Sequence, residues 1–89
     1  YPDCRTEFVS ALRPAIRLAT AWHPVELKAP FIDMTKAEIV KLGLKLGVPY
    51  ELTWSCYRGE ERPCRCCPTC IEREEAFAIN RALDLLAHL

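Results

Sequence analysis

Hydrophobic positions fall into runs with helical spacing, the first of them between residues 5 and 22. Its apolar side chains recur every three or four residues and predict an amphipathic helix. These are Phe8, Ala11, Leu12, Ala15, Ile16 and Ala19. Pro14 lies inside this run and predicts either a kink or a late start of the helix. Asp3, just ahead of the run, is a candidate for its N-cap.

The second run predicts a helix over residues 35–46. Thr35 and Glu38 stand three residues apart, as in a capping box that satisfies free N–H groups at a helix start. Gly47 follows as a candidate for a left-handed C-cap. A third run predicts a terminal helix over residues 69–87. We therefore expect a mostly helical chain.

Two short segments have the pattern of strands. Residues 25–30 alternate apolar and polar side chains up to a proline, which predicts a short strand. Residues 52–55 suggest a second extended segment. The expected fold of this chain is therefore mostly α with one or two short strands, plus a loop rich in cysteine at residues 56–70.

Composition narrows the function classes. The chain has 89 residues, and its 12 Lys and Arg balance 12 Asp and Glu. A neutral chain without a basic run gives no long-range attraction for nucleic acid or an anionic membrane. No apolar run reaches the roughly 18 residues that a membrane span needs. The chain opens in a motif-like stretch without an initiator Met, so we expect it to be the carboxy-terminal part of a longer protein.

Five of the six cysteines lie between residues 56 and 70. Cys64, Cys67 and Cys70 are spaced as two overlapping C-x-x-C steps, and Cys56 precedes them. Four thiolates in one short loop suit a tetrahedral zinc ion, which would leave no open position for water. The predicted zinc is therefore structural, with one ion per chain.

Two other interpretations of the cysteines remain open. A disulfide framework fits poorly, because Cys66 and Cys67 are neighbours and the C-x-x-C steps overlap. An iron–sulfur cluster also uses four cysteines, and C-x-x-C-x-x-C overlaps the start of a ferredoxin motif. Within the zinc interpretation, Cys66 is the spare cysteine.

Three segments together resemble the carboxy-terminal part of the 7-cyano-7-deazaguanine synthase family, the QueC family of queuosine biosynthesis. They are Y-P-D-C-R at residues 1–5 with Glu7 and Phe8, T-K-A-E-I at residues 35–39, and T-W-S-C-Y at residues 53–57 leading into the cysteines and Arg73. The combination is far more specific than any one segment. Two positions depart from the family pattern, namely Thr6 in place of a frequent proline and Arg65 in place of a frequent glycine.

The resemblance implies an ATP-dependent carbon–nitrogen ligase of the cytoplasm. Such enzymes adenylate 7-carboxy-7-deazaguanine, add ammonia, and dehydrate the amide to a nitrile. The implied full-length fold is α/β, a Rossmann-like ATP pyrophosphatase of the PP-loop type with zinc at its far end. The implied partners are small molecules, with ATP and Mg²⁺ as substrate. A homodimer is compatible with the resemblance, whereas a membrane or nucleic-acid partner is not expected.

The resemblance also assigns residues. Lys36, in the first turn of a helix, is placed on the ATP phosphate side, where a lysine beside free N–H groups stabilises developing charge. Asp3 is the candidate for the guanine-like face, because a carboxylate accepts from ring N–H and amine together. Arg5 is the candidate for the substrate carboxylate or a phosphate. Roles for Cys4 and Cys66 are not assigned.

The phosphate loop of PP-loop enzymes is missing from this chain. That loop reads S-G-G-x-D-S, whereas the three glycines here, Gly43, Gly47 and Gly59, are never adjacent. Residues 1–89 alone are therefore not expected to turn over ATP. The competing interpretations are a zinc-knuckle module that binds RNA or a protein, with Trp54 and Tyr57 as stacking side chains, and another PP-loop enzyme such as a tRNA-modifying relative.

Overall fold

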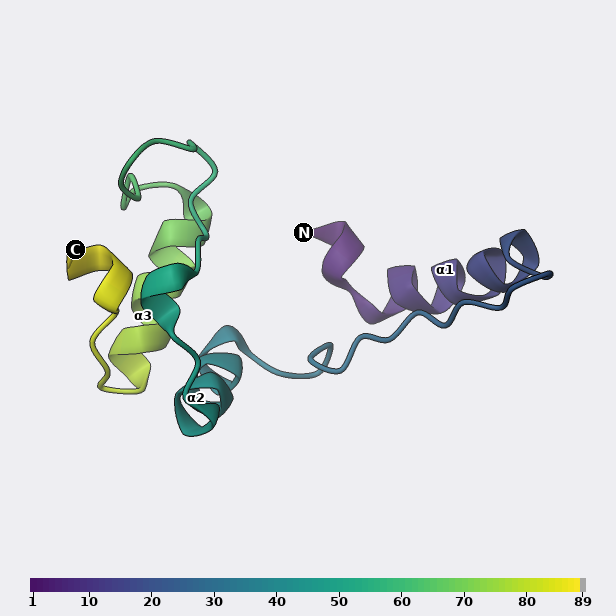
Figure 1. Cartoon of the computed structure of the whole chain (residues 1–89), viewed down its shortest axis with the longest axis horizontal. Helices are drawn as coiled ribbons and strands as arrows, with labels where there is room; N and C mark the ends of the chain where they lie inside the picture. Colours follow the sequence, from purple (N-terminus) through teal and green to yellow (C-terminus); the bar gives the residue numbers. More distant parts are fainter. Residues whose placement is uncertain (89) are drawn as a thin grey trace. The chain divides into compact units, whose positions relative to one another are not determined.

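The computed structural model describes residues 1–88, with side chains through residue 86. The chain forms two compact units, residues 1–33 and residues 34–89. Helices supply the regular structure of both units, and the part of the chain described here contains no strand (Figure 1). The predicted helical character is confirmed, the predicted strand at 25–30 is wrong, and the extended segment expected at 52–55 forms no second strand.

The first unit consists of a 3-10 turn, one helix and an irregular segment. The turn η1 spans Pro2–Cys4 and the helix α1 spans Thr6–Ala19. Arg5, not Asp3, is the N-cap of α1, and it makes no side-chain cap hydrogen bond. The predicted N-cap is therefore wrong, because residues 2–4 form a turn of their own. The helix runs through Pro14, so the late start is also excluded.

The segment predicted as a strand follows α1 in an irregular conformation. The alternating pattern at residues 25–30 has no neighbouring strand among the described residues to complete a ladder. A side chain, and not a second strand, bonds to its backbone: the Arg13 Nε donates a hydrogen bond to the Leu27 carbonyl at 3.1 Å. Alternation indicated an extended chain but could not supply a pairing partner.

The second unit begins with the helix α2, Lys36–Leu46. Its predicted capping box is confirmed: the Glu38 N–H donates to the Thr35 hydroxyl, and the Thr35 N–H donates to the Glu38 carboxylate, both at 3.1 Å. Gly47 closes the helix in the left-handed conformation, at φ 76°. The turn η2, Tyr50–Leu52, follows.

The helix α3 spans Pro68–Ile79, and a separate turn η3 spans Leu85–His88. The predicted terminal helix over 69–87 is therefore interrupted. The Ala82 N–H donates to the Phe77 carbonyl and the Arg81 N–H to the Ala78 carbonyl, both at 3.0 Å, with Arg81 at φ 53°. This is a Schellman closure. It escaped prediction because arginine occupies the position that glycine usually takes.

The core of the second unit forms where α2 packs against α3. Val40, Ala76 and Phe77 are its buried members, and Tyr50 packs against them from η2. The rings of Tyr50 and Phe77 meet edge to face with centroids 5.0 Å apart. A methyl group on Gly43 would lie 1.9 Å from the Tyr50 hydroxyl oxygen, so only glycine fits there.

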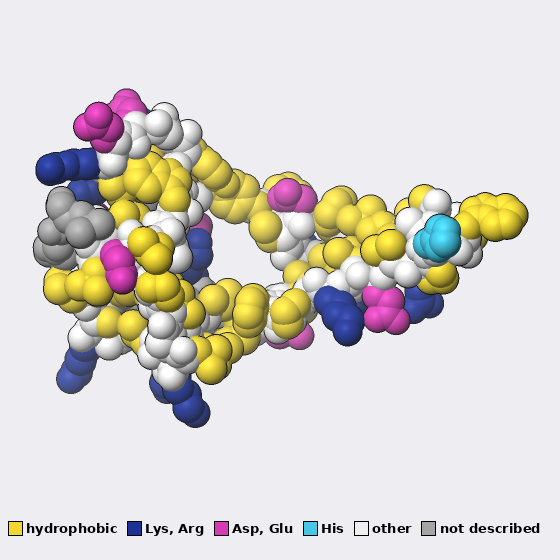
Figure 2. Space-filling model, in the orientation of Figure 1, with side chains coloured by type: hydrophobic (Ala, Val, Ile, Leu, Met, Phe, Trp, Pro, Cys, Tyr) yellow, Lys and Arg dark blue, Asp and Glu magenta, His cyan; other side chains and the backbone are white. Residues whose placement is uncertain are grey.

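Many large hydrophobic side chains of both units lie on the surface (Figure 2). In the first unit, α1 buries only Val9, whereas Leu18 is 82% and Trp22 is 92% exposed. An exposed apolar surface of this extent is typical of an interface. None of the described helices is long and apolar enough to span a membrane.

Candidate metal centre

Four cysteine sulfurs of the second unit converge on one point. Their Sγ atoms all lie within 4.8 Å of one another, and they belong to Cys56, Cys64, Cys67 and Cys70. Cys56 follows the η2 segment, Cys67 is the N-cap of α3, and Cys70 lies in its first turn. Cys56 and Cys70 are buried and the other two are half-buried. The structure thus brings together the four cysteines that the sequence selected.

Backbone N–H groups surround these sulfurs. The Cys64 N–H donates to the Cys56 Sγ at 3.3 Å, and the N–H groups of Cys66 and Cys67 donate to the Cys64 Sγ at 3.4 and 3.2 Å. The Thr69 hydroxyl lies 3.2 Å from the Cys67 Sγ. Such donors stabilise thiolates, which are the form of cysteine that binds metal.

The pKa values of the cysteines in the cluster are shifted in different directions. Hydrogen bonding with the Thr69 hydroxyl and with backbone groups lowers the pKa of Cys67 to about 5. The N–H groups of Cys66 and Cys67 lower the pKa of Cys64. Burial raises the pKa of the Cys70 thiol to about 12. A metal ion at this point must therefore displace protons, so its affinity rises with pH.

The distances between the sulfurs distinguish a single metal ion from an iron–sulfur cluster. Four thiolates at ~2.3 Å from one zinc ion lie about 3.8 Å from each other. The Cys64 and Cys70 sulfurs are 4.0 Å apart, and the whole set falls within 4.8 Å. A four-iron cluster binds each thiolate to a different iron, which would hold the sulfurs farther apart. The residues fit a single tetrahedral ion.

Cys66 lies outside this cluster, as predicted for the spare cysteine. Its side chain is exposed, and it is not one of the four residues grouped around the common point. All six cysteines are free thiols in the structure, so the disulfide framework is not formed. Four cysteines are therefore positioned to bind a metal ion.

Arg73 forms a buried network beside the cysteine cluster. Its Nε and Nη2 donate to the two carboxylate oxygens of Asp84 at 2.6 and 3.0 Å. Its Nη1 donates to the Ser55 hydroxyl at 3.2 Å, and its Nη2 also donates to the Tyr50 carbonyl at 3.0 Å. Ser55 precedes Cys56, and Arg73 lies one helical turn after Cys70. The network therefore ties together the elements that carry two of the four cysteines.

Sequence reasoning named Arg73 only as part of a motif and missed Asp84. A signal existed, because Asp84 is an acidic residue within an apolar run. Its partner could not be identified, since the run was interpreted as one continuous helix. The interruption at Asn80 and Arg81 is what turns the chain back toward Arg73.

The other predicted site residues are placed as follows. Lys36 is the first residue of α2, and its ammonium lies 3.8 Å from the Glu72 carboxylate of α3. Asp3 lies in η1 and Arg5 at the start of α1, and both are exposed. Asp3 and Arg5 belong to the first unit, and Lys36 to the second. Their assigned roles remain predictions.

The fold and the cysteine cluster together define a helical protein segment with a loop whose four cysteines are positioned to bind a metal ion. A family model described as "Queuosine biosynthesis protein QueC" matches residues 1–81. The chain belongs to this family.

Its relatives carry one name. A 7-cyano-7-deazaguanine synthase from Archaeoglobus fulgidus is 67% identical over 97% of the chain, which covers 36% of that protein. The synthase from Caldicellulosiruptor saccharolyticus is 57% identical over 86% of the chain and 34% of its own length. The synthase from Aquifex aeolicus is 49% identical over 86% of the chain and 38% of its own length.

The chain thus spans little more than a third of the length of these relatives. No solved structure gives a significant match. Because the resemblance in the sequence named the same family, that prediction is confirmed.

Proposed function

We propose that the chain is the carboxy-terminal, zinc-binding part of an ATP-dependent ligase that makes 7-cyano-7-deazaguanine for queuosine biosynthesis. The observation that carries this proposal is the family match over residues 1–81, together with relatives named 7-cyano-7-deazaguanine synthase. The full-length enzyme would have the Rossmann-like PP-loop fold and take ATP with Mg²⁺ as substrate.

The proposed reaction has two activation steps. A carboxylate oxygen of 7-carboxy-7-deazaguanine bonds to the α-phosphorus of ATP, and pyrophosphate leaves. Ammonia then attacks the acyl carbon, AMP departs, and loss of a proton gives the amide. The amide oxygen is adenylated by a second ATP with release of pyrophosphate, and loss of AMP and of both N–H protons of the amide nitrogen leaves the nitrile.

Three residues of the chain are proposed to take part. Lys36, at the N-terminal end of α2, would stabilise negative charge on the phosphate in the transition state. Asp3 would accept hydrogen bonds from the guanine-like face, and Arg5 would pair with a carboxylate or phosphate. The exposure of Asp3 and Arg5 leaves both side chains accessible to a ligand.

Zinc is proposed as the resident ion of the cluster of Cys56, Cys64, Cys67 and Cys70. Its four thiolates would complete the coordination shell, so the ion would stabilise the loop and not react. The Arg73 network lies on the same elements, which makes correct placement of α3 the expected consequence of metal binding.

Turnover by the full-length enzyme tests this function. With 7-carboxy-7-deazaguanine, ATP and ammonia, mass spectrometry should detect the nitrile, with AMP and pyrophosphate as co-products. Lys36→Ala should lower kcat about 100-fold, as expected for loss of one charge-stabilising donor. Asp3→Ala should raise KM for the acid. Absence of nitrile from the unaltered enzyme would refute the proposal.

A further inference from the structure

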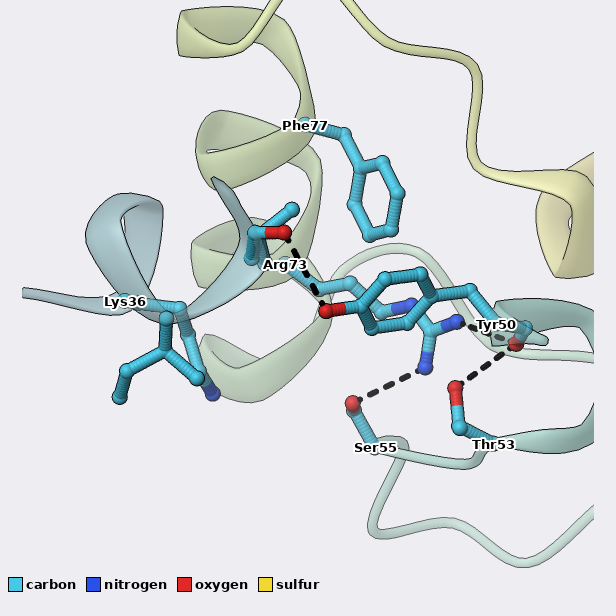
Figure 3. A pocket seen from close by; sticks show the side chains of 8 residues that line it. Lys36, Tyr50, Thr53, Ser55, Arg73 and Phe77 are labelled. Atoms are coloured by element: carbon cyan, nitrogen blue, oxygen red, sulfur yellow. Dashed lines mark hydrogen bonds between the residues drawn. The ribbon is translucent and has the colours of Figure 1, made fainter. Parts of the chain in front are cut away.

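The second unit contains a cavity of ≈ 170 Å³ between α2, α3 and the segment that follows η2 (Figure 3). Ile39 and Val40 of α2, the Tyr50 ring and the Phe77 ring form its apolar walls. A cavity of about 150 Å³ lined by apolar side chains holds one benzene ring. The volume therefore suits one planar ring, with any further atoms at the mouth.

Arg73 also lines this cavity, but its charge is already matched. The guanidinium is bound by both oxygens of Asp84. Two of its remaining N–H groups donate to Ser55 and to the Tyr50 carbonyl (Figure 3). The Arg73 and Asp84 side chains are only 9% and 10% exposed. Arg73 therefore shapes the cavity and does not attract a ligand anion.

Lys36 is the other cation that lines the cavity, and its charge is accessible. Its ammonium lies 3.8 Å from the Glu72 carboxylate, and the two side chains are 46% and 48% exposed. Exposed ion pairs contribute little net free energy, because water screens both charges. An anionic ligand that places its charge at Lys36 can therefore displace Glu72 at little cost.

Two hydroxyl groups supply directional polar contacts on the same wall. The Thr53 hydroxyl donates to the Tyr50 carbonyl at 2.7 Å and can still accept. The Ser55 hydroxyl accepts from Arg73 at 3.2 Å and can still donate. Each hydroxyl therefore has hydrogen-bonding capacity left for the edge of a heterocycle.

We propose that this cavity binds the ring of a planar heteroaromatic carboxylic acid, with its carboxylate at Lys36. The ring would lie against the Phe77 and Tyr50 rings, where an aromatic contact adds to the apolar burial. A phosphate alone would leave the apolar walls uncovered, and a neutral ring would leave Lys36 unused. This inference rests on the proposed function, and it names the place where the acid binds.

The same position of Lys36 serves the adenylation step. The carboxylate oxygen that bonds to the α-phosphorus brings the phosphate to the group that Lys36 already contacts. One ammonium at the mouth therefore holds the acid before the reaction and stabilises the phosphate charge during it.

Calorimetric binding to the zinc-loaded full-length enzyme tests the proposal. The probes are 7-carboxy-7-deazaguanine and its neutral counterpart, 7-cyano-7-deazaguanine. Lys36→Met should weaken binding of the acid by about fivefold, the upper range for an ion pair at a half-exposed ammonium. The affinity of the same variant for the nitrile should differ from that of the unaltered enzyme by less than about twofold, because the nitrile carries no charge for Lys36 to pair with.

Two further variants should change the ligand affinity in opposite directions. Glu72→Gln removes the competing carboxylate, so it should tighten binding of the acid by up to about fivefold. Ile39→Phe fills the cavity and should weaken both probes. Lys45→Met, an exposed change in the last turn of α2 that does not line the cavity, is the matched control and should leave both affinities unchanged.

The outcomes separate this inference from the function on which it rests. If the unaltered enzyme forms nitrile, an unaltered acid affinity in Lys36→Met, or in a folded Ile39→Phe variant, would overturn the assignment of the cavity and leave the proposed function standing. Failure of the unaltered enzyme to form nitrile would overturn the function. Because Lys36 is exposed, its variant tests the cavity even if Ile39→Phe does not fold.

Discussion

Arg65 occupies a backbone conformation that favours glycine. Its backbone lies at φ 64°, in the left-handed region that glycine adopts most easily. The cost of this conformation is partly offset by the side chain, because its Nε donates a hydrogen bond to the Glu74 carboxylate at 2.9 Å. This is the position at which glycine is frequent in the resembled family, and the structure shows the positive φ that would favour it.

Replacing Arg65 by glycine should therefore stabilise the loop once the ion pair is removed. In a Glu74→Gln background, Arg65→Gly should raise the free energy of unfolding by about 1 kcal/mol, because an L-residue in this region costs about 1–2 kcal/mol. Denaturant unfolding of the metal-loaded protein measures the change. An equal or lower stability would show that the loop does not strain Arg65.

At the scale of elements, hydrogen bonds to side chains decide where the helices begin and end. The capping box of Thr35 and Glu38 starts α2. The Asn80 amide donates to the Ala37 and Ala76 carbonyls at 2.9 and 2.8 Å, so it closes α3 and joins it to α2. Arg73 then holds the returning segment through Asp84. The helix pair is thus fixed by polar contacts at its ends as well as by its small core.

The buried Arg73–Asp84 pair should contribute far more to stability than the exposed Arg65–Glu74 pair, although each pair has one member on α3. Asp84→Ala leaves a buried guanidinium without its counter-charge, and the expected loss of unfolding free energy is about 3–5 kcal/mol. The matched control is Glu74→Ala, which breaks the exposed pair with Arg65 and should cost about 0–1 kcal/mol. Thermal and denaturant unfolding compare the two. Similar losses would mean that burial does not strengthen the pair.

The capping box makes the stability of α2 depend on pH. Hydrogen bonds from the Thr35 backbone and side chain lower the pKa of Glu38 below its ordinary value of 4.5. Since the folded pKa is the lower one, the contribution is fully present above pH 4.5 and is lost as the pH falls through the folded pKa.

Glu38→Gln, which keeps a hydrogen-bonding group without a titrating one, should therefore show a smaller loss of stability below pH 4.5 than the unaltered protein. Unfolding midpoints across this range measure the difference. Metal release on acidification affects both proteins and cancels in the comparison. Parallel pH profiles would contradict the assignment.

For the molecule as a whole, the two units differ in how much they bury. The first unit buries Val9 in a 14-residue helix, and isolated helices of this length are marginal in water. The second unit has a core, a buried ion pair and the cysteine cluster. Its order is expected to depend on the metal, because ligand binding to the folded loop contributes directly to folding.

Hydrogen exchange with mass spectrometry should reveal this difference. Chelation should speed amide exchange in residues 53–79 and leave that of α1 nearly unchanged, because α1 contains no cysteine of the cluster. Cys67→Ser should mimic chelation and lose the metal, whereas Cys66→Ser, the neighbouring control, should keep one ion per chain. Loss of metal in Cys66→Ser would reassign the ligands.

The sequence by itself determined the local features of this protein. Helical spacing, the capping box and the spacing of cysteines are set by residues close together in the chain, so α1, α2 and the four-cysteine loop could be predicted. Its motifs also indicated the family. Only the tertiary structure decided what depends on distant partners: residues 25–30 lack a strand to pair with, Arg81 ends α3 without glycine, and Asp84 reaches Arg73. The cavity at Lys36 arises from the same packing, since its walls come from segments that only folding brings together.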